Sequence, residues 1–381
     1  FINQNNFFNK EKMYIKKIEL NKANFFFKRK DFSFLKSFLN KEFSEKNIKI
    51  KKSKFFYNDS SGNVVFIYTT NQTNIFKSDE DVQNLFESNG KIFNIPTNIF
   101  WSKDLETKDE TLKINTKKVF FNLINKSIFN GDRLEHENIL NIASGRFKTK
   151  YEIKEKNIKI KSEKSSIKNI PISYEGKINF KPFSFSLNIN SKEINFLYLL
   201  KNSFILNEII LSNALNQKSL NGRVNIKSDK LTKNKIFEKL NLNINFDEGR
   251  INLNNSQFIS NKIGKMELFN SYFLEKDKKI FFEGTLRFKV NKTKEFYKIL
   301  LVPKKKRKDF EKIDFNFSYD LTDKYANINN IIFYSQKGKK INSEKIDDIV
   351  ENNIENQYNI LNFNSLKNFL KKIFYIYSEE G

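Results

Sequence analysis

KLNLNINFDEGRINLNNSQFISNKIGKMELFNSYFLEKDKKIFFEGTLRFKV, residues 239–290, has the most regular pattern in this chain. Leu240, Leu242 and Ile244 alternate with asparagine, and after a turn at 247–249 the alternation resumes. Strict alternation of apolar and polar residues is typical of a strand with one dry face and one wet face. Repeated with short turns, it predicts an antiparallel meander. What covers the apolar face stays open at this point: a second sheet, helices or a lipid.

The same alternation recurs along most of the chain, and segments with helical spacing interrupt it. Strands are expected in a hairpin at 47–70, across 90–189, across 220–290 and at 313–319. Helical spacing of apolar residues predicts helices at 32–39, 78–88, 190–217, 293–301 and 365–377. The predicted fold is mainly β: a long twisted antiparallel sheet curled into an open groove, with a few amphipathic helices. Three segments are expected: an N-terminal β/α segment at 1–90, a repeated β-groove at 91–335 and a helical segment at 336–381.

The composition limits the classes of function. The formal net charge of +25 resembles that of a nucleic-acid-binding protein, but the cations are nearly all Lys. Arg, which reads phosphates and bases by paired hydrogen bonds, is rare, and A/T-rich codons explain the abundance of Lys, Asn, Ile and Phe. The absence of Cys excludes disulfides and thiolate metal sites. The 42 Phe residues recur periodically, so the chain is expected to fold.

No motif in the sequence predicts catalysis, a cofactor or a metal. His136 is the only histidine, and no nucleophile or metal ligand accompanies it in the sequence. The acidic cluster at 104–110 lacks the ligand spacing of a calcium loop, and the basic run at 303–308 is interpreted as a solvated turn. Aromatic residues and Lys fall on opposite faces of the same predicted strands, which favours an apolar surface over a stacking platform for nucleic acid. The chain is therefore expected not to be an enzyme.

Three tracts in the alternating region resemble a known family. They are LNGRVNI at 220–226, FEKLNLNINFDEGRINLNNS at 237–256 and IGKMEL at 263–268. Together they resemble the C-terminal region of AsmA-like proteins, the group of Gram-negative envelope proteins that includes TamB and YhdP. The similarity is best over 150–335. It implies a β-groove that carries phospholipid between membranes in the periplasm and supports outer-membrane biogenesis, with no catalytic residues.

The resemblance also implies a location and partners. The chain begins at Phe1 and has no run of 18 apolar residues, so an N-terminal helix that anchors it in the inner membrane is expected to be missing from this sequence. The expected partners are phospholipid and bacterial membranes, with other envelope proteins left open and no nucleic acid. The residues expected to line the apolar groove are Phe180, Phe183, Phe185, Leu187, Leu242, Ile244, Phe246, Phe288, Phe315 and Phe317.

Two alternatives to a lipid-conducting groove stay open. In the first, the chain is a structural envelope scaffold that does not transport lipid, because its own helices at 190–217, 291–301 and 365–377 cover the whole apolar face. In the second, it is a basic nucleic-acid-binding module whose affinity falls steeply with salt. The lipid groove is favoured, because the apolar face of the predicted sheet is expected to stay at least partly uncovered by protein.

Overall fold

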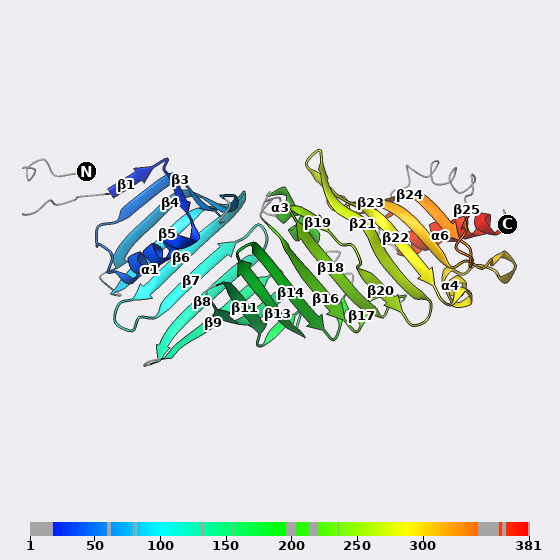
Figure 1. The fold of residues 1–381 in the computed structure, drawn as a ribbon, viewed down its shortest axis with the longest axis horizontal. Helices are drawn as coiled ribbons and strands as arrows, with labels where there is room; N and C mark the ends of the chain where they lie inside the picture. Colours follow the sequence, from blue (N-terminus) through cyan, green and yellow to red (C-terminus); the bar gives the residue numbers. More distant parts are fainter. Residues whose placement is uncertain are drawn as a thin grey trace, which may run out of the picture. The chain divides into compact units, whose positions relative to one another are not determined.

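The structure is a computed structural model, and it confirms a mainly β fold: one long mixed, mostly antiparallel sheet with helices beside it (Figure 1). The chain divides into two compact units, the first made of 1–185 with 212–220 and the second of 186–211 with 221–381. The residues that the structure describes are 18–58, 62–78, 80, 82–130, 133–154, 156–195, 203–212, 220–234, 236–341, 358–359 and 363–379.

The first unit is a strand meander that begins with two parallel pairings. β1 and β2 both pair in parallel with β3, and the described pairings among β3 to β13 are antiparallel. Its elements are β1 (Ile18–Asn21), β2 (Asn24–Phe27), α1 (Phe32–Asn40), β3 (Ile48–Asn58), β4 (Val64–Ser78), β5 (Gln83–Ile92), β6 (Ile95–Asp104), β7 (Glu110–Thr116), β8 (Phe121–Asn130), β9 (Arg133–Ile142), β10 (Gly145–Ile153), β11 (Asn157–Ser162), β12 (Ser165–Ile167) and β13 (Ile170–Phe180). The next strand, β14 (Phe183–Ser191), lies at the division between the units.

Small residues fill the inner face where β3, β4 and β5 bend. The register of β4 against β5 shifts between Thr70 and Gln72, and such a bulge increases the local twist of a sheet. At Gly90, a Cβ atom would lie 2.2 Å from the carbonyl oxygen of Thr69, so the backbones approach too closely for any side chain. The Ser88 hydroxyl lies 2.6 Å from that of Thr73, which satisfies both polar groups in this buried place.

The helix predicted at 78–88 is wrong, because Ser78 ends strand β4 and residues 83–88 belong to strand β5. Ser78 pairs with Gln83 across the hairpin, and β5 also pairs with β6 on its other side. Leu85 and Phe86 are adjacent and could share a helix face, but in the strand they point to opposite faces of the sheet. Phe86 packs against the cluster that contains Trp101. Two flanking strands therefore override a local helical pattern.

Helix α1 forms as predicted and covers one part of the inner face of the first unit. Phe38 and Leu39 pack against a buried cluster of Phe43, Ile50, Ile75 and Trp101. Asn84, which is fully buried, holds the segment after the helix: its side chain accepts a hydrogen bond from the Phe43 N–H at 2.8 Å and donates one to the Lys41 carbonyl at 2.7 Å.

The second unit repeats the meander and adds helices at one end. Its elements are β15 (Ile194–Asn195), α3 (Ser203–Leu211), β16 (Gly222–Ser228), β17 (Leu231–Thr232), β18 (Lys239–Asp247), β19 (Arg250–Asn252), β20 (Gln257–Ser260), β21 (Gly264–Lys276), β22 (Lys279–Val290), α4 (Thr293–Leu300), β23 (Lys312–Asp320), β24 (Tyr325–Tyr334), β25 (Lys340–Ile341), β26 (Tyr358–Asn359) and α6 (Phe363–Glu379). Of the helical prediction at 190–217, α3 is confirmed, Ile194 instead lies in the short strand β15, and 196–202 and 213–217 lie outside the described residues.

The main core of the second unit lies where α4 and α6 pack on the sheet. Ile313, Ile373 and Phe374 are fully buried there, and Tyr297 is nearly so. Phe374 of α6 has ring centroids within 5.3–5.5 Å of Phe296, Tyr297, Phe310 and Phe333. Helices at 293–301 and 365–377 were predicted from their apolar stripes, and these stripes are the faces that pack here. The core therefore joins the sheet to both helices.

Candidate functional site: the apolar inner face

The inner face of the second unit is apolar along rows of residues that sit opposite one another on neighbouring strands. One row runs through Leu240, Phe258, Met266, Phe288, Ile313 and Phe333. We call it the sealed row, because Leu240, Phe288, Ile313 and Phe333 are buried in the core that includes α4 and α6, while Phe258 and Met266 pack against that core and are half-buried. The next row contains Leu268, Leu286, Phe315 and Ile331, of which Leu286 and Phe315 are only half-buried. Part of this apolar face is thus closed by helices, and part is accessible.

The predicted groove residues lie on five strands and are divided between the units. Phe180 is in β13, and Phe183, Phe185 and Leu187 are in β14; Leu242, Ile244 and Phe246 are in β18, Phe288 is in β22, and Phe315 and Phe317 are in β23. Phe288 and Phe317 are each 8% exposed, and the other eight are half-buried. Phe288 contacts Phe296 of α4 at 5.1 Å between ring centroids, so it belongs to the core. Leu242 and Phe315 pack at the border of that core.

The opposite face of the same strands carries charges. Arg287 of β22 donates two hydrogen bonds of 2.7 Å to Asp314 of β23, and Glu267 of β21 forms ion pairs with Lys265 at 2.6 Å and Lys289 at 3.1 Å. Desolvation by itself would raise the pKa of Glu267, but the two ammonium groups hold that pKa below its ordinary value. The alternation seen in the sequence therefore separates hydrocarbon from charge across one layer of sheet.

The inner face of the first unit differs, because it divides into rows of unlike polarity. An apolar row runs across five strands through Ile99, Ile114, Leu123, Leu140 and Phe147. Beside it lies a polar row, in which Asn125, Asn138, Thr149 and Ser162 sit opposite one another on β8 to β11. The sequence does not predict this division, since each strand alternates correctly by itself and only the register aligns the polar positions.

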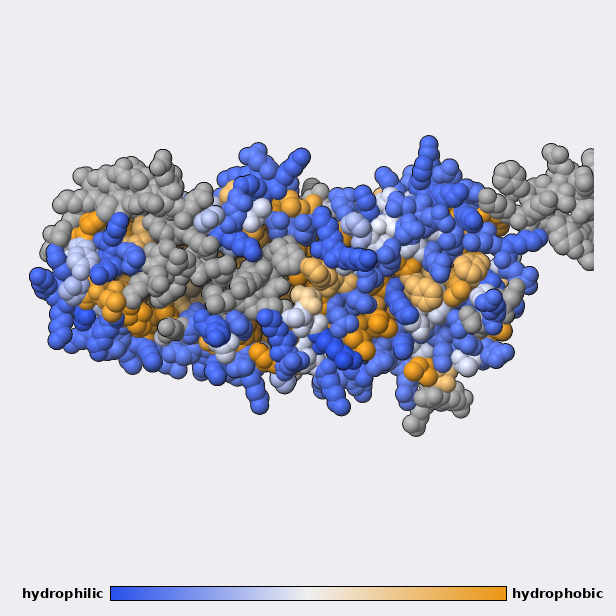
Figure 2. Space-filling model, turned by 180° about the vertical axis from the view of Figure 1, so that it is seen from behind, coloured by the Kyte–Doolittle hydropathy of each residue, from blue (hydrophilic) through white to orange (hydrophobic). Residues whose placement is uncertain are grey.

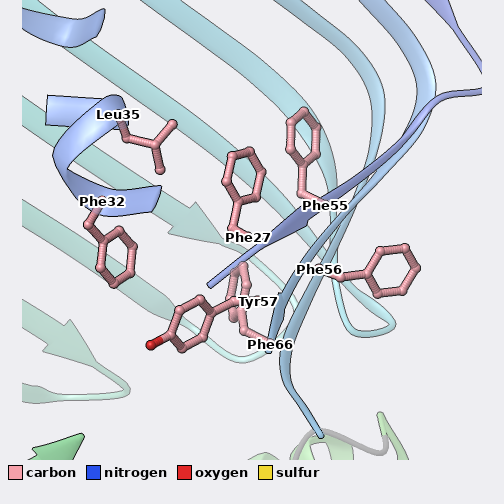
Figure 3. Close-up of a pocket in the computed structure, with 7 residues that line it drawn as sticks. All are labelled: Phe27, Phe32, Leu35, Phe55, Phe56, Tyr57 and Phe66. Atoms are coloured by element: carbon pink, nitrogen blue, oxygen red, sulfur yellow. The ribbon is translucent and has the colours of Figure 1, made fainter. Parts of the chain in front are cut away.

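An aromatic hollow of about 320 Å³ opens on the inner side of β2 and β3, near α1 (Figure 3). Phe27 and Phe55 point into it, and Phe32 and Leu35 of α1 stand across from them. Phe25 stacks on Phe55 with ring centroids 4.6 Å apart, which extends the aromatic surface along β2 and β3. Its volume is at the small end of ligand pockets. The sequence does not predict this hollow either, because β2 reaches β3 only through a parallel pairing that no local pattern indicates.

A space-filling view of one face shows hydrophobic side chains gathered in its hollow parts, between hydrophilic side chains at the rims (Figure 2). Within the described ranges, no group of three or more side chains is arranged to hold a metal ion. His136 Nδ1 lies 2.9 Å from Oγ of Ser127, its partner on the neighbouring strand; the imidazole is exposed, and Ser127 is buried. None of the helices that the structure describes is long and apolar enough to cross a membrane.

No family model, curated protein or solved structure matches this chain. The likeness to AsmA-like proteins therefore stays a hypothesis that depends on the tracts at 220–226, 237–256 and 263–268.

Proposed function

We propose that this chain is a non-enzymatic lipid carrier of the Gram-negative cell envelope, which conducts phospholipid through an apolar β-groove in the periplasm and supports outer-membrane biogenesis. The observation that carries the proposal is the accessible part of the apolar inner face. Leu286 and Phe315 of the second unit are half-buried although neighbouring strands, and helices at one end, pack around them. The most direct use for an apolar sheet face that protein covers only in part is contact with hydrocarbon.

The energetics support hydrocarbon as the occupant. Each buried methylene group of a lipid tail contributes about 0.8 kcal/mol, so a lined groove can offset the removal of a tail from its bilayer. Charged residues would oppose this, because an unpaired buried charge is strongly unfavourable. In the second unit, the charges of Glu267, Arg287 and Asp314 lie on the opposite face and are paired with one another or with Lys265 and Lys289.

Substitution of Phe315 by Asp tests the proposal. The variant places a carboxylate on the accessible apolar row, so we expect at least a tenfold loss of co-purifying phospholipid, measured by native mass spectrometry of the purified chain. A tenfold loss corresponds to about 1.4 kcal/mol, well below the effect of burying an unpaired carboxylate. Asn316→Asp is the matched control, because it adds the same charge at the next residue of β23, which points to the opposite face.

The β content measured by circular dichroism should be the same in both variants and in the parent chain. If Phe315→Asp keeps its full complement of phospholipid while remaining folded, the groove does not conduct lipid through this row. If the parent chain carries no phospholipid at all, even after incubation with liposomes, the proposal fails as a whole.

A structural scaffold is the second candidate, and the core beneath α4 and α6 favours it. There Phe288 and Phe333 of the sealed row contact aromatic rings of α4 and α6, which is the kind of cover that the scaffold hypothesis requires for the entire face. The two functions make different predictions for Leu286 and Phe315. A lipid carrier binds phospholipid against these residues, whereas a scaffold binds none there. The experiment on Phe315 therefore distinguishes them.

A further inference from the structure

We propose that the inner face of the first unit is an amphipathic binding surface, on which the polar row holds the polar end of a lipid while the apolar row holds its hydrocarbon. This inference rests on the proposed function, and it adds where the polar end lies and which kind of group contacts it. The second unit provides an internal comparison, because its equivalent face is apolar from Leu240 to Phe246 and from Ile313 to Phe317.

The register of the strands aligns the members of the polar row. Asn125 pairs with Asn138, Asn138 with Thr149, and Thr149 with Ser162, so four polar residues follow one another across β8, β9, β10 and β11. Neighbouring strands are about 4.8 Å apart, so this row is about 14 Å long. The polar row is therefore continuous across four strands and is not a single polar residue on an apolar face.

The apolar row lies beside the polar row on the same face. Leu123, Leu140 and Phe147 are each two residues from a member of the polar row along their own strands. Two residues of a strand span about 7 Å, so hydrocarbon and hydrogen-bonding groups meet within the reach of a single amphipathic molecule. A face that contacts only the chain's own core or only hydrocarbon does not require a polar row beside its apolar row.

The chemistry of the polar row is neutral. Asparagine, threonine and serine side chains both donate and accept hydrogen bonds, and none of them carries charge. Charged residues of the same strands point outward, where Lys148 pairs with Glu137 at 3.0 Å and Lys150 with Glu163 at 2.7 Å. The row therefore fits the phosphodiester and glycerol oxygens that all phospholipids share, and its contacts do not depend on the net charge of the headgroup.

The hydroxyl groups of two tyrosines extend the row toward its neighbours. The amide of Asn125 donates to the Tyr151 hydroxyl at 3.2 Å, and the Thr149 hydroxyl lies 2.5 Å from that of Tyr174. These contacts orient the polar side chains before a ligand arrives. Preorganised groups bind with a smaller loss of conformational entropy, so the row is suited to repeated contact with a moving headgroup.

The first test removes hydrogen-bonding groups while keeping the shape of the face. We would compare the double variant Asn138→Leu, Thr149→Val with the outward control Asn141→Leu on β9, using liposomes of dipalmitoyl phosphatidylglycerol and the uncharged hydrocarbon fluorophore diphenylhexatriene. The double variant should bind about tenfold less phospholipid, the effect of losing one to two net hydrogen bonds, while its uptake of diphenylhexatriene stays unchanged. Liposomes of phosphatidylcholine should give the same ratio, because the row is neutral.

The second test needs no loss of hydrogen bonds and uses the absence of cysteine in the chain. A fluorophore is attached at Ser162→Cys on the polar row or at Leu140→Cys on the apolar row, and quenching is measured with phospholipids that carry a nitroxide on the headgroup or at the end of an acyl chain. The headgroup nitroxide should quench the label at position 162 more strongly, and the chain-end nitroxide the label at 140.

The outcomes separate the two proposals. Equal phospholipid binding by the double variant, or equal quenching at both positions, would overturn the amphipathic surface while leaving the groove intact. If the parent chain takes up neither phospholipid nor diphenylhexatriene, the lipid-carrying function itself is wrong.

Discussion

Replacing Phe374 with alanine removes the centre of the core beneath α4 and α6. Its ring is fully buried and has four aromatic neighbours, Phe296, Tyr297, Phe310 and Phe333, all with ring centroids within 5.5 Å. Three of these contacts are edge-to-face, the geometry in which the positive edge of one ring meets the negative face of the other. The substitution leaves a cavity that these large, rigid rings can only partly fill.

The expected destabilisation is about 3–5 kcal/mol, the usual range for a buried phenylalanine replaced by alanine. Urea unfolding followed by circular dichroism should show a midpoint lower by about 1–1.7 M, if the dependence of unfolding free energy on urea is about 3 kcal/mol per M. Hydrogen exchange should be faster along α6 and α4, because loss of this contact releases both helices from the sheet.

Phe34→Ala is the matched control, because it makes the same change at a side chain of α1 that is 67% exposed. Substitutions of exposed residues usually change stability by less than about 0.5 kcal/mol, so its midpoint should stay close to that of the parent chain. Equal midpoints for Phe374→Ala and Phe34→Ala, with unchanged exchange along α6, would refute the reasoning that α6 seals this end of the apolar face.

Two further predictions concern the anchoring of α1 and the charged face. Asn84→Ala should destabilise the first unit by about 1–3 kcal/mol and increase exchange at Phe43, because the Phe43 N–H and Lys41 carbonyl lose their partner; unchanged exchange there would contradict this. For Glu267, the lowered pKa means that its contribution to stability is present above the ordinary pKa of a glutamate, about 4.3, and is lost as pH falls through the lower folded value. Thermal unfolding of the parent chain and Glu267→Gln should therefore differ most at neutral pH and converge in acid, and a difference that widens in acid would show that the ion pairs with Lys265 and Lys289 do not lower this pKa.

Strands and helices with strong local patterns were predictable. The alternation at 313–319 corresponds to β23, and the apolar stripe at 365–377 lies within α6. In both segments, the pattern in the sequence marks the face that packs against the core. At 78–88 the spacing of apolar residues predicts a helix, and this prediction is wrong. Hydrogen bonds of β5 to β4 and β6 stabilise the strand more than the helix propensity of so short a segment stabilises a helix. Tertiary pairing of this kind leaves no trace in the spacing of apolar residues within β5.

The candidate site was predictable in kind but not in detail. Alternation indicates that Phe315 and Leu242 lie on an apolar face, but it does not distinguish them from Phe288, which the folded chain covers with α4. The polar row and the aromatic hollow also escaped prediction, since both are made by residues far apart in sequence that share a face only through strand register.

The amino-acid sequence alone determined that the chain forms a β-sheet with an apolar side and a charged side, because side chains of a strand alternate with period two whatever its neighbours are. Only the tertiary structure decided which apolar residues are sealed beneath helices, which stay accessible and where polar positions align across strands. The physical reason is that strand register and helix packing depend on contacts between segments far apart in the sequence. The residues of one segment alone do not determine the free energy of these contacts.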